Sequence, residues 1–522
     1  MNYISRIDKL AILYLILPLC LFVWGWLKIW LAIPLLIILA VAVAKLWCEA
    51  HSECNMHEIG WSYKEFIPAL AIFAAYLFLT GMTGNWAQHG DYYVRNDIFW
   101  SLTMYSWPPE LKDGKYFVYY FQTWLPSALV GKIFGWKAAL WSYYIWMCIG
   151  SVFSLYYIFK YVGKCAFWIA FVFFAWNGLE LIPCAVVAPL LRDMPIKEAF
   201  SLNEHVAGNF LTESPMFSMK NIAHCFIPVS IICGMLLIRN IIRKIGPALG
   251  MLAVMYSPMS AIFLLPILLF LFLREYFPSP RLLANRTSWT LMLKESLSFY
   301  NLAVLLTFVL LIVPFYLSPS SISEFSLERL VTGKRLCLFL YYLIFNVFLV
   351  AVLIRQNVKD NLLWVVLLTH VVCIGCGVAF HADVSMKGSV LTTCFLIAMF
   401  CRSFAKAQNV SKAAYIIYSI LGCQYLIYMT GALAALIGSA GVWLIMHVRF
   451  RWCVTAMVTS AFILCLLGVY KPQVFSSVKS KLMGEKVRYS EHMGIYQPDG
   501  GSGLWWWYRT FGDSQSMPIW FR

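Results

Sequence analysis

A dense group of polar side chains interrupts an otherwise apolar sequence near residue 90. The segment "GDYYVRND" brings Asp91, Arg95, Asn96 and Asp97 together just after a hydrophobic stretch. A carboxylate beside a hydrophobic segment is partly desolvated, which raises its pKa and makes it a better base. Asp91 and Asp97 are therefore the candidate catalytic bases. The alternative interpretation is a solvated loop in which both acids form ion pairs with Arg95.

Aromatic side chains surround these polar residues, namely Tyr92, Tyr93, Trp100, Tyr105 and Trp107. Tyr and Trp gather at membrane interfaces, which explains them without any ligand. They also stack on the apolar faces of sugar rings. We therefore treat Trp107, together with Asn96, as a candidate substrate-binding residue.

A second polar group lies in residues 203–228, "NEHVAGNFLTESPMFSMKNIAHCFIP". Its titratable residues are Glu204, His205, Glu213, Lys220 and His224. Each one alone fits an ordinary polar loop. As a set that faces the Asp91 loop, they are candidates for binding an acceptor.

A third group, "HADVSMKGS", contains Asp383 and Lys387 between two apolar segments. A lysine near a helix N-terminus suits a phosphate group, since backbone N–H groups and the helix dipole also favour an anion there. We expect Lys387, with Arg95, to bind a phosphate and Asp383 to contact the substrate. A lysine that merely extends to the membrane interface is the alternative.

One cysteine–histidine cluster does not predict a metal site. Cys48, His51, Cys54 and His57 recur at every third residue. Zinc ligands usually occur in pairs with other spacings, and a helix would turn each of these away from the last. A polar helix end or loop is the better interpretation.

The composition indicates which elements position these residues. The 522 residues are 61% hydrophobic and only 12% charged, whereas a soluble domain has about 25% charged residues. Continuous apolar segments predict helices rather than barrel strands. We therefore expect an all-α, polytopic transmembrane bundle over residues 1–470, with about 13–15 membrane segments. The predicted spans are 10–27, 30–47, 66–83, 138–160, 165–187, 222–240, 246–273, 299–318, 336–354, 362–381, 388–404, 413–429, 432–447 and 453–470.

The net charge of +16 comes from lysines and arginines scattered over short loops. Such loops face the cytoplasm, so the charge reflects membrane topology and not nucleic-acid binding. The loops fall on one side if the N-terminus is cytoplasmic, 117–135 lies at the outer interface, and 246–273 is a re-entrant hairpin of two half-depth helices. The outer side then holds the loops 84–137 and 188–221 and an aromatic C-terminal tail, 471–522.

These motifs together resemble the GT-C superfamily of membrane glycosyltransferases, in the type that uses polyprenyl-phosphate sugars. The resemblance rests on "GDYYVRND…YSWP…VYYFQTWLPSALVGKIFGW", "YSPMSAIFLLP" and "HADVSMKGS". The acids here are six residues apart and not the DxD or DD that is common in the superfamily, so the resemblance leaves Asp91 and Asp97 as rivals. It implies a bacterial cytoplasmic-membrane enzyme.

The resemblance also implies the reaction. Asp91 would deprotonate an acceptor hydroxyl, and Lys387 with Arg95 would stabilise the departing lipid phosphate. The acceptor would be a glycan, a lipid or a protein, and a divalent metal (Mg or Mn) is compatible with the reaction but not required. Two alternatives remain open: a transporter or flippase for a lipid-linked glycan, and an enzyme of the O-antigen polymerase or ligase type.

Overall fold

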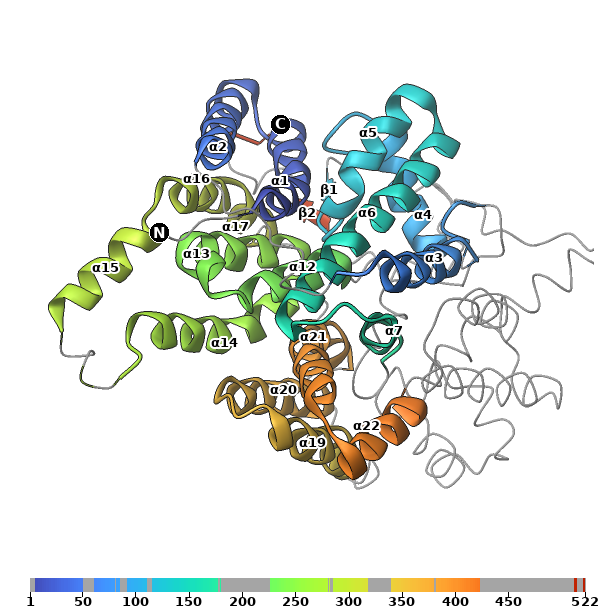
Figure 1. The fold of residues 1–522 in the computed structure, drawn as a ribbon. Coiled ribbons are helices and arrows are strands. Elements are labelled where there is room, and N and C mark those ends of the chain that lie inside the picture. Colours follow the sequence, from blue (N-terminus) through green and yellow to red (C-terminus); the bar gives the residue numbers. More distant parts are fainter. Residues whose placement is uncertain are drawn as a thin grey trace, which may run out of the picture.

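The computed structural model describes residues 5–49, 61–79, 81–84, 92–109, 115–176, 179, 226–279, 281, 285–317, 339–379, 382–422, 511–513 and 520–521. Over these residues the protein is all-α, apart from one pair of three-residue strands. The helices pack into one bundle, and the C-terminus lies beside the first two helices (Figure 1).

Eight helical segments in the described residues are long and apolar enough to cross a membrane, so the chain is a multi-pass membrane protein. Seven of them coincide with predicted spans, and α14 overlaps the second part of the predicted segment 246–273. They are α1 (Arg6–Trp26), α2 (Ile29–Cys48), α6 (Trp136–Val162), α14 (Pro258–Tyr276), Phe299–Leu317, Phe339–Asn357, α20 (Leu362–Ala379) and α21 (Ala382–Lys406).

Two of these spans contain π-helical turns. The first consists of α16 (Phe299–Thr307), η4 (Phe308–Ile312) and α17 (Val313–Leu317). The second includes η5 (Leu343–Phe348) and α19 (Leu349–Asn357). A π-turn inserts one extra residue, so it shifts which side chains face the bundle.

The remaining helices are shorter or more polar. They are α3 (Tyr63–Leu79), α4 (Tyr92–Met104), η1 (Gln122–Trp124), α5 (Leu125–Phe134), α7 (Phe167–Ala175), α12 (Phe226–Leu236), α13 (Arg239–Tyr256), α15 (Arg286–Ser296) and α22 (Asn409–Gly422). The predicted spans at 432–447 and 453–470 lie outside the described residues.

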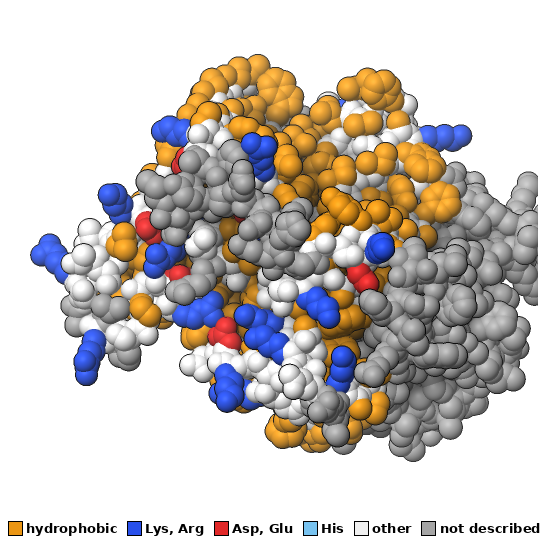
Figure 2. Space-filling model, viewed as in Figure 1, with side chains coloured by type: hydrophobic (Ala, Val, Ile, Leu, Met, Phe, Trp, Pro, Cys, Tyr) orange, Lys and Arg blue, Asp and Glu red, His pale blue; other side chains and the backbone are white. Residues whose placement is uncertain are grey.

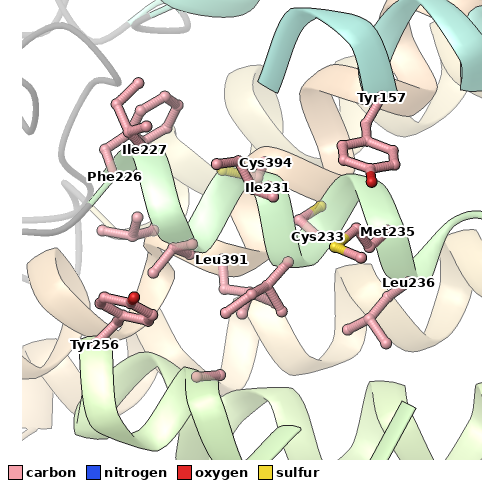
Figure 3. Packing of buried hydrophobic residues seen from close by; sticks show 14 of the residues in the cluster. Tyr157, Phe226, Ile227, Ile231, Cys233, Met235, Leu236, Tyr256, Leu391 and Cys394 are labelled. Atoms are coloured by element: carbon pink, nitrogen blue, oxygen red, sulfur yellow. The ribbon is translucent and has the colours of Figure 1, made fainter. Parts of the chain in front are cut away.

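Helix α12 lies at the centre of the bundle. All of its residues are buried. Figure 3 shows its Phe226, Ile231 and Leu236 packed among side chains that include Tyr157, Tyr256 and Leu391. On the face drawn in Figure 2, hydrophobic side chains cover the outside of α1, α2, α5 and α6, as expected for surfaces in contact with lipid.

Charged side chains collect at one end of the bundle, which we call the Asp8 end. Asp8 is 2% exposed, accepts a hydrogen bond from Tyr157 at 2.9 Å, and lies 3.6 Å from the Lys160 ammonium. Further contacts at the same end are Lys244–Glu49, Arg243–Glu275 and Arg274–Asp360, with Arg402 over the Tyr161 ring. The short basic loops that contain these described residues are therefore at one end of the structure, and the loop at 449–451 lies outside the described residues. That this end faces the cytoplasm stays a prediction.

Aromatic side chains collect at the opposite end, which we call the Trp26 end. The Phe22 ring lies 4.9 Å from the Trp26 ring and 4.9 Å from the Phe315 ring. Phe121 stacks on Trp26 with ring centroids 5.0 Å apart, and Trp107 lies 6.0 Å from Trp26. These contacts join α1, α17 and the chain around η1 into one aromatic core.

Helices α13 and α14 form a hairpin, with the break at Ser257 and Pro258 where the "YSPMS" motif predicts it. Gly250 faces Leu268 and Gly246 faces Phe272, so the helices run antiparallel. Helix α14 has 19 residues and is long enough to cross a membrane. The helices thus exceed the half-depth length that we expected, and the re-entrant position of the hairpin stays a prediction.

The segment 117–135 contains only one α-helix of ten residues, α5. At 1.5 Å per residue such a helix is about 15 Å long, half of the hydrocarbon thickness. Ile133 and Phe134, near its end, are 68% and 72% exposed. This geometry agrees with a helix at the membrane interface.

The C-terminal end of the chain is anchored at the Trp26 end. Strand β2 (Phe511–Asp513) pairs antiparallel with β1 (Lys115–Phe117). The Lys28 N–H donates to the Trp520 carbonyl at 2.8 Å, and the Trp520 Nε1 donates to the Leu310 carbonyl at 3.0 Å. Trp520 and Phe521 therefore pack on the protein.

We expect the Phe521→Ala protein to be less stable by about 2 kcal/mol, since burying a phenylalanine side chain contributes about that much. Phe521 is 5% exposed and bridges to Leu27, whereas Phe134 is 72% exposed. Thermal unfolding in detergent measures the effect, with Phe134→Ala as the control. Equal melting temperatures for the two variants would show that the C-terminal contact does not stabilise the fold.

Candidate functional site

Helix α4 carries part of the first predicted group, and it lies at the Trp26 end. Arg95 and Asn96 are buried, at 8% and 4% exposed. These two side chains are therefore not solvated, whereas the solvated-loop alternative for Asp91 and Asp97 stays untested. Asp91 lies outside the described residues, and Asp97 lies within α4 although its side chain is not among those described.

Phe99 fixes α4 against its neighbours. Its ring lies 5.3 Å from Trp136, 5.7 Å from Tyr143 and 6.0 Å from Trp124. These partners belong to η1 and to the first two turns of the span α6, so α4 packs against both. The positions of Arg95 and Asn96 are therefore set by packing.

Trp107 has a structural role in this packing. Its Nε1 donates to the Leu102 carbonyl at 2.6 Å, and its ring packs so closely on Gly25 that a Cβ there would lie 2.8 Å from Cε3. The side chain is 8% exposed. These contacts account for Trp107 without a ligand, and its predicted substrate contact remains untested.

Lys132 of α5 is a basic residue at this end that the sequence analysis did not select. Its Nζ lies 5.2 Å from the centroid of the Trp107 ring and donates to the Tyr105 carbonyl. Burial lowers the pKa of this ammonium group from its ordinary value of 10.5, because the charged form loses contact with water. The sequence does not show that Lys132 lies close to Trp107, because that contact depends on where α5 packs.

We expect the amine of Lys132 to titrate below pH 10.5 in the folded protein. The unprotonated amine is the form that reacts with acetic anhydride, so acetylation of Lys132 should rise at lower pH than in the same chain unfolded in detergent. Peptide mass spectrometry after pulse labelling at several pH values gives both midpoints. A folded-state midpoint at or above the unfolded one would contradict the desolvation.

Hydrogen bonds connect the other motifs at this end. Tyr316 of α17 donates to the Met255 carbonyl at 2.9 Å and lies 3.4 Å from Gln122 Oε1. Beyond the hairpin turn, Ser257 donates to Ser260 at 2.8 Å. The Ser260 hydroxyl in turn donates to the carbonyl of Lys387. The segments 117–135, 246–273 and 381–389, far apart in the sequence, therefore meet in the structure.

Lys387 is held in place by close helix packing. It lies in the second turn of α21, which is beyond the first turn where the helix dipole acts strongly. The expectation of a lysine at the helix N-terminus is corrected accordingly. Its neighbour Gly388 allows contact with Phe263 and Cys373, since a Cβ there would lie 2.7 Å and 2.8 Å from their atoms. Asp383 lies in the first turn of the same helix, and its side chain is not among those described.

Several buried polar atoms near the aromatic core have no hydrogen-bond partner in the described structure. They are Trp26 Nε1, Gln122 Nε2, Thr123 Oγ1, Ser127 Oγ and Ser101 Oγ. A buried polar group without a partner costs about 1–3 kcal/mol. Such atoms also occur elsewhere in the described residues, for example in Tyr161, Asn346 and Thr393, but these five lie at the end where the motifs meet.

His370 is a second residue that the sequence analysis missed. It is 1% exposed in the middle of α20. Thr392 donates to the Ser389 carbonyl, so its oxygen accepts from His370 Nδ1 at 2.8 Å, and His370 Nε2 accepts from Tyr342 at 2.7 Å. The ring is thereby fixed as the neutral Nδ1–H tautomer. A histidine inside a hydrophobic span was the signal for it in the sequence.

The second predicted group, Glu204, His205, Glu213, Lys220 and His224, lies outside the described residues. Of the cysteine–histidine cluster, only Cys48 is described. Within the described parts of the chain, no three His, Cys, Asp or Glu residues converge as metal ligands.

Comparison with known proteins gives no match for this chain, whether with protein-family models, with curated proteins or with solved structures.

Proposed function

We propose that this protein is an integral membrane glycosyltransferase that moves a sugar from a polyprenyl phosphate to a glycan, lipid or protein acceptor. One observation supports it above the others: three polar motifs from distant parts of the chain come together at the Trp26 end. The buried Arg95 and Asn96 of α4 are at the same end. Helix packing alone does not require polar residues at this end of the bundle. A binding site for a charged substrate with many hydroxyl groups does require them.

In the proposed reaction, an acceptor hydroxyl oxygen forms a bond to the anomeric carbon while the bond from that carbon to the phosphate oxygen breaks. The hydroxyl proton passes to Asp91, and the electrons of the broken bond leave with the polyprenyl phosphate. One displacement inverts the configuration. Lys387 and Arg95 offset the charge on the phosphate, and Asp91 then releases its proton to water.

The proposed acceptor contacts come from the remaining polar residues. They are Asn96, Trp107, Asp383 and the group Glu204, His205, Glu213, Lys220 and His224. The Trp26 end would face away from the cytoplasm, since the basic side chains collect at the Asp8 end. Nucleotide sugars are absent on that side, which is why a lipid-linked donor is proposed.

The test is transfer of radiolabelled sugar from a synthetic polyprenyl-phosphate sugar by the purified protein in liposomes. We expect label to move to an added acceptor or to water, with release of polyprenyl phosphate. Polyprenyl-phosphate mannose, glucose, galactose and arabinose cover the usual donor chemistry. No turnover of any donor, with protein that remains folded, would contradict the proposal.

A transporter for a lipid-linked glycan is the second candidate, and His370 is the observation that favours it. Ionisable residues in the middle of a span mark many transport pathways. Both ring nitrogens of His370 are, however, already hydrogen-bonded within the protein, one to Tyr342 and the other to Thr392. In the same liposomes, a transporter would move the lipid-linked sugar between leaflets without breaking its phosphate bond.

A further inference from the structure

Two buried side chains at the Trp26 end carry hydrogen-bond donors that the protein does not use. Gln122 Nε2 and Trp26 Nε1 have no acceptor in the described structure, and the side chains are 0% and 1% exposed. Buried amide and indole N–H groups nearly always have a partner in native proteins. A ligand or a water molecule from outside the chain would supply the missing acceptor for both N–H groups.

The chain around Phe121 connects the two side chains. Phe121 stacks on Trp26 with ring centroids 5.0 Å apart, and Gln122 is the next residue in the chain. On the other side, Phe315 lies 5.9 Å from Phe121, and its neighbour Tyr316 reaches Gln122 Oε1. The Tyr316 hydroxyl contacts only one atom of the amide, so the other atom is left for a ligand.

Further hydroxyl groups follow along the same short helices. Thr123 Oγ1 and Ser127 Oγ are fully buried and also lack partners. They are four residues apart, so they share one side of the helix. A hydroxyl can donate or accept, and the cluster therefore suits a ligand with several hydroxyl groups better than a single ion.

We infer that Gln122 and Trp26 form a hydrogen-bonding site for the hydroxyl groups of a neutral sugar. Both donors are uncharged, and Phe22, Phe121 and Phe315 belong to the aromatic core that contains Trp26. Burying a phosphate among such rings requires a cation. A sugar requires only hydrogen bonds for its hydroxyls and an aromatic face for its C–H groups. The inference rests on the proposed function, since it assigns the sugar half of the substrate.

The experiment is ligand-observed saturation-transfer NMR on the full chain, in a detergent whose headgroup contains no sugar. The probes are methyl glucoside, galactoside, mannoside and arabinoside, with inorganic phosphate as the charged competitor. We expect at least one glycoside to bind, phosphate not to displace it, and Gln122→Leu to weaken binding at least tenfold. Trp26→Phe, which keeps an aromatic ring but removes the N–H, should weaken the same glycoside.

Ser154→Ala is the matched control, because Ser154 is also fully buried but already bonds Ser230 at 2.6 Å. It should leave glycoside binding unchanged. Gln122→Leu should not lower the melting temperature of the ligand-free protein, since it removes a buried amide nitrogen that has no partner, and Tyr316 keeps its bond to Met255. A correctly folded variant with weak binding supports the inference.

Three results would overturn it: no glycoside binding, equal binding to the wild type and Gln122→Leu, or displacement by phosphate. A lower melting temperature with unchanged binding would assign the cluster to bound water instead. If Gln122-dependent binding occurs without transfer from any polyprenyl-phosphate sugar, the proposed function fails and the inference stands. If Gln122→Leu transfers sugar at the wild-type rate and KM, the inference alone fails.

Discussion

Asp91→Asn is expected to reduce sugar transfer by about 10²–10⁴-fold, the usual contribution of a positioned general base. Asparagine has nearly the same shape and keeps the hydrogen-bonding oxygen, but it cannot accept a proton from the acceptor hydroxyl. The loss should therefore appear in kcat, while KM for the lipid-linked donor changes little. The measurement is the liposome transfer assay with saturating acceptor.

Asp97→Asn is the matched control for this prediction, because Asp97 is the rival acid in the same polar segment. If Asp91 is the base, Asp97→Asn should retain most of the activity. The opposite result would exchange their roles, whereas full activity in both variants would show that neither acid is the base. Raising the pH tests the role further, since the residual rate of Asp91→Asn should increase as hydroxide replaces the missing base.

Gly377→Ala is expected to lower the free energy of unfolding by about 3 kcal/mol, at the upper end of the usual cost of overpacking. A Cβ at this position would lie 2.2 Å from the Cβ and Oγ of Ser385 and 3.0 Å from its backbone nitrogen. Those atoms are fixed to the backbone, so α20 and α21 would have to separate. Lys387 lies half a turn beyond Ser385, so the proposed phosphate contact would shift with the helix.

Gly375→Ala is the control on the same helix. Its Cβ would meet only Phe339 Cζ, at 4.0 Å. Both substitutions gain the same helix propensity, about 1 kcal/mol, so the difference in melting temperature between them isolates the packing term. Adding Ser385→Gly to Gly377→Ala should recover part of the loss. Equal melting temperatures for the two alanine variants would show that the helices are not in close contact.

The fold class was predictable from the sequence because the membrane imposes it. Spans such as 10–27, 138–160 and 362–381 lie within a few residues of the helices observed, since about 20 apolar residues are needed to cross a bilayer. The break at Pro258 was predictable for an equally local reason, as proline lacks an N–H and restricts the residue before it.

The candidate site was predictable only in part. The sequence indicated the motifs that contain Gln122, Ser257 and Lys387, but it selected only Lys387 of these three as a site residue. Gln122 lies within the motif "VYYFQTWLPSALVGKIFGW", and its unpartnered amide emerges only from the packing around Phe121. Trp107 is a further case, since the sequence indicates a sugar-stacking residue and only the structure shows that its N–H is bonded to Leu102.

The sequence by itself determined that the chain crosses the membrane many times as helices, and which basic loops share one end. Both follow from local composition, because the cost of placing a charge or an unpaired backbone group in lipid acts residue by residue. Only the tertiary structure decided that Tyr316 contacts both Gln122 and Met255, and that Ser260 donates a hydrogen bond to the Lys387 carbonyl. It also decided that the N–H groups of Trp26 and Gln122 have no acceptor in the described structure. Those relations depend on how helices from distant parts of the chain rotate against one another, and local hydrophobic patterns do not specify that rotation.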